Sequence, residues 1–128
     1  MKEGGVMKKI LIVDDEKEVV EAISHFLKRR HFDVLTAFDG QDAWDKIKNS
    51  NLSIIVLDVM MPGMGGLELC EKIKHDPQLK DIPILMLSAR CGDIDRNIGY
   101  VCGANFYQGK PCQPKVLLEK IEELLEVK

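Results

Sequence analysis

Four short apolar runs in this chain lead into residues that can bind a phosphoryl group or its metal ion. In chain order they are followed by Asp14 and Asp15, by Asp58, by Ser88 and, after two intervening residues, by Lys110. Runs of this length between helical stretches are typical of buried parallel strands. In an open α/β sheet, ligands bind outside the carboxyl ends of the strands. We therefore expect three carboxylates, a hydroxyl and an ammonium to meet at one edge, as a phosphoryl-transfer site built around an aspartate.

The adjacent acids Asp14 and Asp15 indicate a cation-binding position. Like charges side by side raise a pKa unless a cation lies between them, and a set of oxygen ligands suits Mg²⁺. In extended backbone the two side chains point to opposite sides, so one can ligate directly and the other acts through water. The run continues with Glu16, however, and acids in a helix's first turn also have an explanation in the helix dipole.

Ser88 and Lys110 each have a second explanation when taken alone, whereas Asp58 is harder to explain without a site. Asp58 ends a wholly apolar strand, where an unpaired carboxylate would be destabilising. Ser88 either hydrogen-bonds a phosphoryl oxygen or caps the following helix. Lys110 is either a surface lysine or an amine that reaches a carboxylate or phosphoryl group, with its backbone restricted by Pro111. Their joint placement at strand ends favours one common site.

The expected strands and helices alternate five times. The strands are expected at residues 10–13, 32–37, 54–58, 82–87 and 106–107. The first helix is expected between the acids at 16 and 18 and the basic residues 28–30, and the second from after Gly40 to about Asn49. The third covers the apolar positions 67–73, and the fourth covers the periodic residues Ile94, Ile98 and Val101. The last is expected from about Pro114 to Val127. Such alternation predicts a parallel sheet with helices on both faces and right-handed crossovers.

The composition fits one domain and argues against several functions. With 128 residues, a net charge of -3 and no stripe of basic residues, nothing favours direct nucleic-acid binding. No apolar segment approaches the length of a membrane span. The four cysteines lack metal-ligand spacing, and reduced thiols suit a cytoplasmic protein. We expect Trp44, Cys70 and Cys102 in the core. Residues 1–6 are expected to form a flexible leader and residues 7–128 the folded domain.

Several motifs resemble the receiver domain of two-component response regulators. They are residues 12–16 with the acidic pair, residues 58–64 with Met-Pro-Gly, Ser88-Ala89, Gly103-Ala104, Tyr107 and Lys110-Pro111. The resemblance covers nearly the whole chain from Met7 and implies a flavodoxin-like α/β fold, a doubly wound sheet of five parallel strands in the order 2-1-3-4-5 with five helices. The chain departs from the family pattern at Gly65, Gly109, Cys112 and residues 90–92, without losing a chemical group of the site.

The resemblance also implies a role for each site residue. By this likeness Asp58 is the phosphoacceptor for a histidine-kinase phosphoryl group, and Mg²⁺ is held by Asp14, Asp15, Asp58 and the backbone carbonyl of Met60. Ser88 is the switch hydroxyl, Lys110 the charge-pairing lysine and Tyr107 the switch aromatic, and the Lys110–Pro111 peptide bond is expected to be cis. The implied partners are a sensor histidine kinase or phosphotransfer protein and a downstream protein or fused output domain. A receiver of this kind catalyses its own phosphorylation and is not a turnover enzyme.

Three other interpretations remain. An aspartate-nucleophile phosphatase would normally have a second acid two residues after the nucleophile, where this chain has Met60. A flavin-binding module of the same topology would need a phosphate-binding loop after the first strand, where Asp14 and Asp15 would repel phosphate. A degenerate receiver that serves only as an interaction scaffold is disfavoured because every expected group is present.

Overall fold

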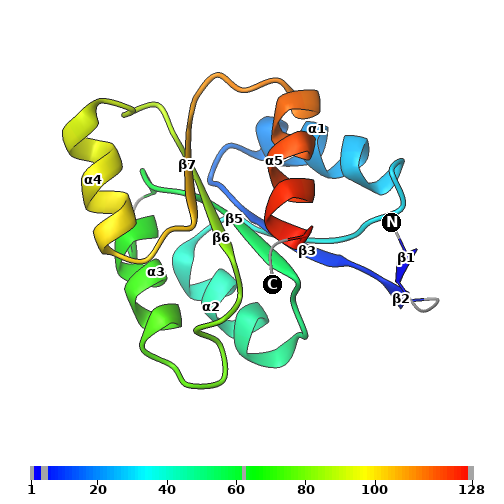
Figure 1. Ribbon diagram of the computed structural model, residues 1–128, viewed down its shortest axis with the longest axis horizontal. Helices are drawn as coiled ribbons and strands as arrows, with labels where there is room; N and C mark the ends of the chain where they lie inside the picture. The colour runs from blue at the N-terminus through cyan, green and yellow to red at the C-terminus, as the bar shows by residue number, and fades with distance from the viewer. Residues whose placement is uncertain (1, 4–5, 62, 127–128) are drawn as a thin grey trace.

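Five parallel strands form the centre of the computed structural model, which describes residues 2–3, 6–61 and 63–126 (Figure 1). They are β3 (Lys9–Val13), β4 (Asp33–Ala37), β5 (Ile54–Asp58), β6 (Ile84–Ser88) and β7 (Phe106–Gly109). Their spatial order is β4-β3-β5-β6-β7. Counted among these five strands alone, this is the predicted order 2-1-3-4-5. The apolar runs form strands because both faces of the sheet are covered, which favours uninterrupted apolar sequence.

Five helices cover the sheet, and two apolar clusters lie between the layers. The helices are α1 (Lys17–Lys28), α2 (Gly40–Asn49), α3 (Gly66–Lys74), α4 (Asp93–Val101) and α5 (Pro114–Glu126). One cluster joins the sheet to α1 and α5, through residues such as Leu27 and Leu117. The other joins the opposite face to α2 and α3, through residues such as Ile47 and Leu69. The doubly wound α/β fold is confirmed.

The N-terminal residues form a separate short pair. Strand β1 (Lys2–Glu3) runs antiparallel to β2 (Val6–Met7), beside the main sheet (Figure 1). The expected leader, residues 1–6, includes Met1, Gly4 and Gly5, which lie outside the described residues, so its flexibility stays a prediction. Val127, the expected end of the last helix, and Pro62 of the loop motif also lie outside them.

The apolar residues that predicted α4 do not form its buried face. Ile94 is 76% exposed, Ile98 43% and Val101 87%, and the buried residue of this helix is Gly99. The helix exists as predicted, but its packing face is different. The side of α4 that meets the sheet lies too close to it for large side chains, and glycine is the buried residue there.

The remaining core predictions are mixed. Cys70 is fully buried as expected, but Cys102 is only half-buried, because it lies at the end of α4 as its C-cap residue. Trp44 is partly buried against the core, with the ammonium groups of Lys48 and Lys72 over its ring at 5.4 and 4.6 Å. Within the described part of the chain, no helix is both long enough and apolar enough to cross a bilayer.

Candidate functional site

The carboxyl ends of β3 and β5 place three acids together. Asp14 follows β3 directly and Asp58 is the last residue of β5; both are buried, at 2% and 4% exposure. Val13 is paired with Leu57 in the sheet, so the two acids lie at the same level of neighbouring strands. Asp15 is exposed. One carboxylate oxygen from each of the three acids lies within 4.8 Å of the others, which makes an acidic pocket.

Local hydrogen bonds fix the two buried carboxylates. Asp14 Oδ1 accepts a hydrogen bond from the backbone N–H of Glu16 at 3.0 Å, and Asp58 Oδ1 accepts one from the N–H of Met60 at 3.2 Å. In each case the acceptor is two residues before the donor, the pattern by which aspartate stabilises a turn. The same side chains that supply the negative charge therefore also set the path of the chain out of the sheet.

Lys110 supplies the positive charge of the pocket. Its Nζ lies 2.8 Å from Asp14 Oδ2, 3.2 Å from Glu16 Oε1 and 3.7 Å from Asp58 Oδ2. Its backbone N–H donates to the carbonyl of Ser88 at 2.8 Å, and the following peptide bond to Pro111 is cis, as the resemblance implied. Burial opposes the charged form of the amine, but the hydrogen bond to Asp14 and the charge of Asp58 outweigh it and raise the pKa of Lys110.

The pocket has more negative than positive charge. Burial, followed by the charge of Asp14, raises the pKa of Asp58 from 3.8 to about 6, although Lys110 and the Met60 amide oppose the rise. A carboxylate with this pKa is still mostly ionised at neutral pH, at an energetic cost that a further cation would relieve. The donors are carboxylate oxygens, which fit a hard divalent cation such as Mg²⁺.

Ser88 ends β6 at the same edge and is fully buried. Its Oγ accepts a hydrogen bond from the backbone N–H of Arg90 at 3.0 Å. The N-cap of α4 is Gly92, which makes no side-chain cap, so the alternative in which Ser88 caps this helix is wrong. In the sheet Ser88 is paired with Gly109. Its strand, β6, lies between β5, which carries Asp58, and β7, which leads to Lys110.

Tyr107 lies in β7 below this edge, with its ring buried at 1% exposure. Its hydroxyl donates to the carbonyl of Arg90 at 2.5 Å. The backbone of Arg90 therefore accepts a hydrogen bond from the Tyr107 hydroxyl at its carbonyl and donates one to the Ser88 hydroxyl from its N–H. In this way Arg90 connects the two predicted switch residues.

Sequence reasoning missed three contacts of this region. The sequence pattern indicates for Glu16 only a place at the start of a helix, whereas in the structure its carboxylate lies 3.2 Å from the Lys110 ammonium. Arg96 and Tyr100 of α4 bind the backbone of Tyr107. No local pattern indicates either contact, because both depend on how α4 lies against an edge strand.

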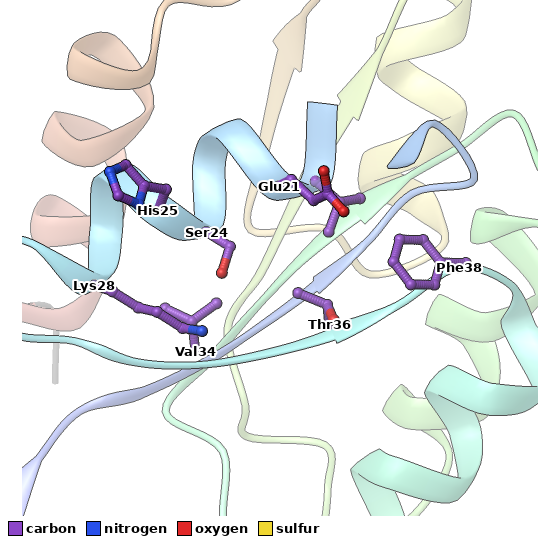
Figure 2. A pocket seen from close by; sticks show the side chains of 8 residues that line it. Glu21, Ser24, His25, Lys28, Val34, Thr36 and Phe38 are labelled. Atoms are coloured by element: carbon purple, nitrogen blue, oxygen red, sulfur yellow. The ribbon is translucent and has the colours of Figure 1, made fainter. Parts of the chain in front are cut away.

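A hollow lies elsewhere, between α1 and β4, and none of the site residues lines it. Figure 2 shows side chains of both elements around it, including Ser24, His25 and Thr36, together with Phe38, which follows β4. The predicted site residues lie instead at the edge formed by the ends of β3, β5 and β6 and the segment after β7.

Comparisons with known proteins agree with this geometry. Residues 10–122 match the model of the response regulator receiver domain. The chain is 37% identical over 118 residues to the alkaline phosphatase synthesis transcriptional regulatory protein PhoP of Bacillus subtilis (strain 168); the match covers 92% of this chain and 48% of that protein. The chain thus spans about half the length of this curated relative.

Solved structures give the same result. The chemotaxis protein CheY4 of Vibrio cholerae is 33% identical, with a TM-score of 0.89 over 93% of this chain and 99% of that one. The BeF3-activated DrrB receiver domain is 30% identical, with a TM-score of 0.85 over 95% of this chain and 100% of that one. The chain belongs to the response regulator receiver domain family. It is accordingly a signalling module rather than a turnover enzyme, which excludes the phosphatase and flavin-binding interpretations.

Proposed function

We propose that Asp58 is the phosphoacceptor and takes its phosphoryl group from a sensor histidine kinase or a phosphotransfer protein. The observation that carries the proposal is the buried Asp58 carboxylate, held at a strand end beside Asp14 and within 3.7 Å of the Lys110 ammonium. An oxygen of Asp58 attacks phosphorus in line, so that a new O–P bond forms as the bond from phosphorus to the donor breaks. Lys110 neutralises charge on the phosphoryl oxygens during this transfer.

The acidic pocket is typical of a magnesium-binding receiver site, and we propose Mg²⁺ as its cofactor. Asp14, Asp15, Asp58 and the carbonyl of Met60 would hold the ion. Support comes from the three clustered carboxylate oxygens and from the raised pKa of Asp58. Bound there, Mg²⁺ supplies electrostatic stabilisation of the phosphoryl oxygens. The contribution of the chain is to keep the carboxylates together, through the turns at Glu16 and Met60 and the ammonium of Lys110.

Ser88 and Tyr107 are proposed as the switch. A phosphoryl group on Asp58 offers acceptor oxygens to the Ser88 hydroxyl, which then turns away from its present place beside the Arg90 N–H. Because the carbonyl of Arg90 holds the Tyr107 hydroxyl, a rearrangement of this loop reaches the ring. Phosphorylation would thus bias two existing arrangements of the segment and would not create a new one.

The receiver family works with histidine kinases and output domains, and the particular partners here are a proposal. We expect a downstream protein, or an output domain fused to the chain, to respond to the switch. We also expect the domain to work in the cytoplasm, without direct contact to nucleic acid or membrane. Its four free thiols support this location.

Phosphorylation by a small acyl phosphate tests the role of Asp58. With Mg²⁺ and acetyl phosphate, intact-mass measurement should show one added phosphoryl group that is stable in acid and labile to base and hydroxylamine. Asp58→Asn should gain none, because the amide is not a nucleophile, whereas Asp45→Asn, at an exposed acid of α2, should behave like the wild type. Labelling of Asp58→Asn would overturn the assignment, and an unlabelled wild type would favour the interaction scaffold.

A further inference from the structure

The ring of Tyr107 occupies the space in which a side chain at position 99 would lie. A Cβ atom added to Gly99 would be 2.6 Å from Cδ2 and 2.8 Å from Cε2 of Tyr107, and 3.2 Å from Sδ of Met86. Cβ atoms do not approach other atoms closer than about 3.0 Å. The ring and any residue larger than glycine at position 99 therefore exclude each other unless one of them moves.

The backbone at Gly99 does not itself need glycine. Gly99 lies inside α4 with a helical backbone, unlike Gly103, which follows the helix with a φ of +116°. Glycine in a helix interior is less favourable than alanine, because it has more conformational freedom to lose. Gly99 thus weakens the helix on its own, and the close approach of the Tyr107 ring is the structural feature that accounts for it.

The rest of Tyr107 is also held by α4 and the loop before it. β7 is an edge strand, and two side chains of α4 bind the backbone of Tyr107: Arg96 Nη1 donates to its carbonyl at 2.9 Å, and the Tyr100 hydroxyl accepts from its N–H at 3.1 Å. The guanidinium of Arg96 also lies over the ring, 5.7 Å from its centroid. The hydroxyl of the ring is bound to Arg90. Ring, backbone and hydroxyl are therefore all tied to one segment, residues 90–100.

We infer that Gly99 is a positioning residue for Tyr107: the slot left by its missing side chain admits the ring to its buried place, so that the ring and α4 change position together. The inference deepens the proposed function, since it rests on Tyr107 as the switch aromatic. The slot itself is a property of the fold and exists whether or not Asp58 accepts a phosphoryl group. Its test can therefore be made without a phosphoryl donor.

Fluorine NMR can follow the ring directly. The chain has two tyrosines, so protein labelled with 3-fluorotyrosine should give two lines, assigned with Tyr100→Phe. The shift of each line between H₂O and D₂O reports solvent exposure. In the wild type it should be small for Tyr107 and larger for Tyr100, which are 1% and 43% exposed. In Gly99→Ala the Tyr107 line should move and gain a solvent shift comparable to that of Tyr100.

Gly92→Ala is the matched control. Gly92 precedes the same helix with a negative φ, and a Cβ there would meet only Asp95 Oδ2, at an ordinary contact distance of 3.6 Å. This variant should leave both lines in place. An unmoved Tyr107 line in Gly99→Ala, with its small solvent shift retained, would overturn the inference.

A double-mutant cycle separates the slot from general helix stability. In a Tyr107→Ala background the ring is gone, so Gly99→Ala should raise Tm by about 3 °C, the gain expected for alanine over glycine in a helix. In the wild-type background the same change should lower Tm. Equal effects in both backgrounds would overturn the inference, because they would leave no coupling between the two positions.

Failure of the single variant to fold would not block the test. The double variant Gly99→Ala with Tyr107→Ala then decides: a folded double variant supports the slot, and an unfolded one overturns it. Acyl-phosphate labelling of the same samples separates this inference from the proposed function. A wild type that is not labelled at Asp58 would contradict the proposed function and leave the inference about Gly99 unaffected.

Discussion

The ammonium of Lys110 is hydrogen-bonded to Asp14, at 2.8 Å, although the two residues are 96 positions apart in the sequence. The same Nζ is 3.7 Å from Asp58, beyond hydrogen-bond distance. Lys110 thus fixes the acid next to the proposed phosphoacceptor and leaves the reacting carboxylate less constrained. This one contact joins the end of β3 to the segment after β7, which are separated in the sheet by β5 and β6.

Removal of the ammonium should destabilise the metal-free domain. Lys110→Gln leaves two buried carboxylates without their cation, and we expect the free energy of unfolding to fall by about 2 kcal/mol. Urea titration in the presence of a chelator measures it. Lys9→Gln is the control, because its 3.9 Å ion pair with Asp33 is partly exposed and should contribute about 0.5 kcal/mol or less. Equal losses in the two variants would show that the buried contact of Lys110 adds no stability.

The raised pKa of Asp58 predicts how stability depends on pH. Folding raises this pKa from 3.8 to about 6, mainly through burial and then through the charge of Asp14. The folded state therefore binds this proton more tightly than the unfolded chain, so the stabilising contribution is complete below pH 3.8 and is lost as pH rises through 6. Without metal at neutral pH, Asp58→Asn should exceed the wild type in stability by on the order of 2 kcal/mol.

The pH profile of that difference is the decisive measurement. Urea unfolding with a chelator, in steps from about pH 4 to about pH 8, should show the advantage of Asp58→Asn shrinking toward the acid end. Asp45→Asn, at an exposed acid, should differ from the wild type by a small and constant amount. A constant advantage for Asp58→Asn would contradict the raised pKa.

Apolar patterning was sufficient to predict the sheet and its functional edge. Three of the four apolar runs are buried throughout, so their length and end could be identified from the apolar pattern; the fourth, at 106–107, has only Tyr107 fully buried. The acids at the carboxyl ends of β3 and β5 then had to meet, because parallel strands in register bring these ends to one level. Geometry confirms this meeting for Asp14, Asp15 and Asp58, whose oxygens form one cluster; their individual roles stay predictions.

The position of α4 could not be predicted in the same way. Periodicity locates a helix, but it identifies the buried face only when that face is apolar. Here Ile94 and Val101 point to solvent, and the helix packs through Gly99. It is attached to β7 by polar side chains, among them Arg96, that hydrogen-bond to backbone groups of this edge strand. Such contacts depend on tertiary geometry and have no sequence period.

Mg²⁺ binding should distinguish the two adjacent acids. Asp15 is exposed and is proposed as a direct ligand, whereas Asp14 is already bonded to Lys110 and to the Glu16 amide and is expected to act at most through water. Calorimetric Mg²⁺ affinity should therefore fall more in Asp15→Asn than in Asp14→Asn, and both variants should phosphorylate slowly.

Controls for the metal prediction lie on the neighbouring helix. Glu18→Gln changes another exposed acid of the first turn of α1 and should leave the affinity nearly unchanged. Unchanged Mg²⁺ binding in both aspartate variants would mean that the pair is only an acidic cluster at the start of a helix.

The coupling between Ser88 and Tyr107 can be tested without altering the acidic pocket. Ser88→Ala should still accept a phosphoryl group, since Asp58 and Lys110 remain, but it has no hydroxyl to move between the Arg90 N–H and the phosphoryl oxygens. Hydrogen exchange with and without beryllofluoride should change most over residues 90–107 in the wild type and little in Ser88→Ala, and Ser88→Thr, which keeps the hydroxyl, should retain the response. Ser88→Ala also loses the hydrogen bond to the Arg90 N–H, which changes its protection even without beryllofluoride. The quantity to compare is therefore the change in exchange on adding beryllofluoride, measured separately in each protein. Equal responses in wild type and Ser88→Ala would mean that the signal leaves the site by a route other than Arg90 and Tyr107.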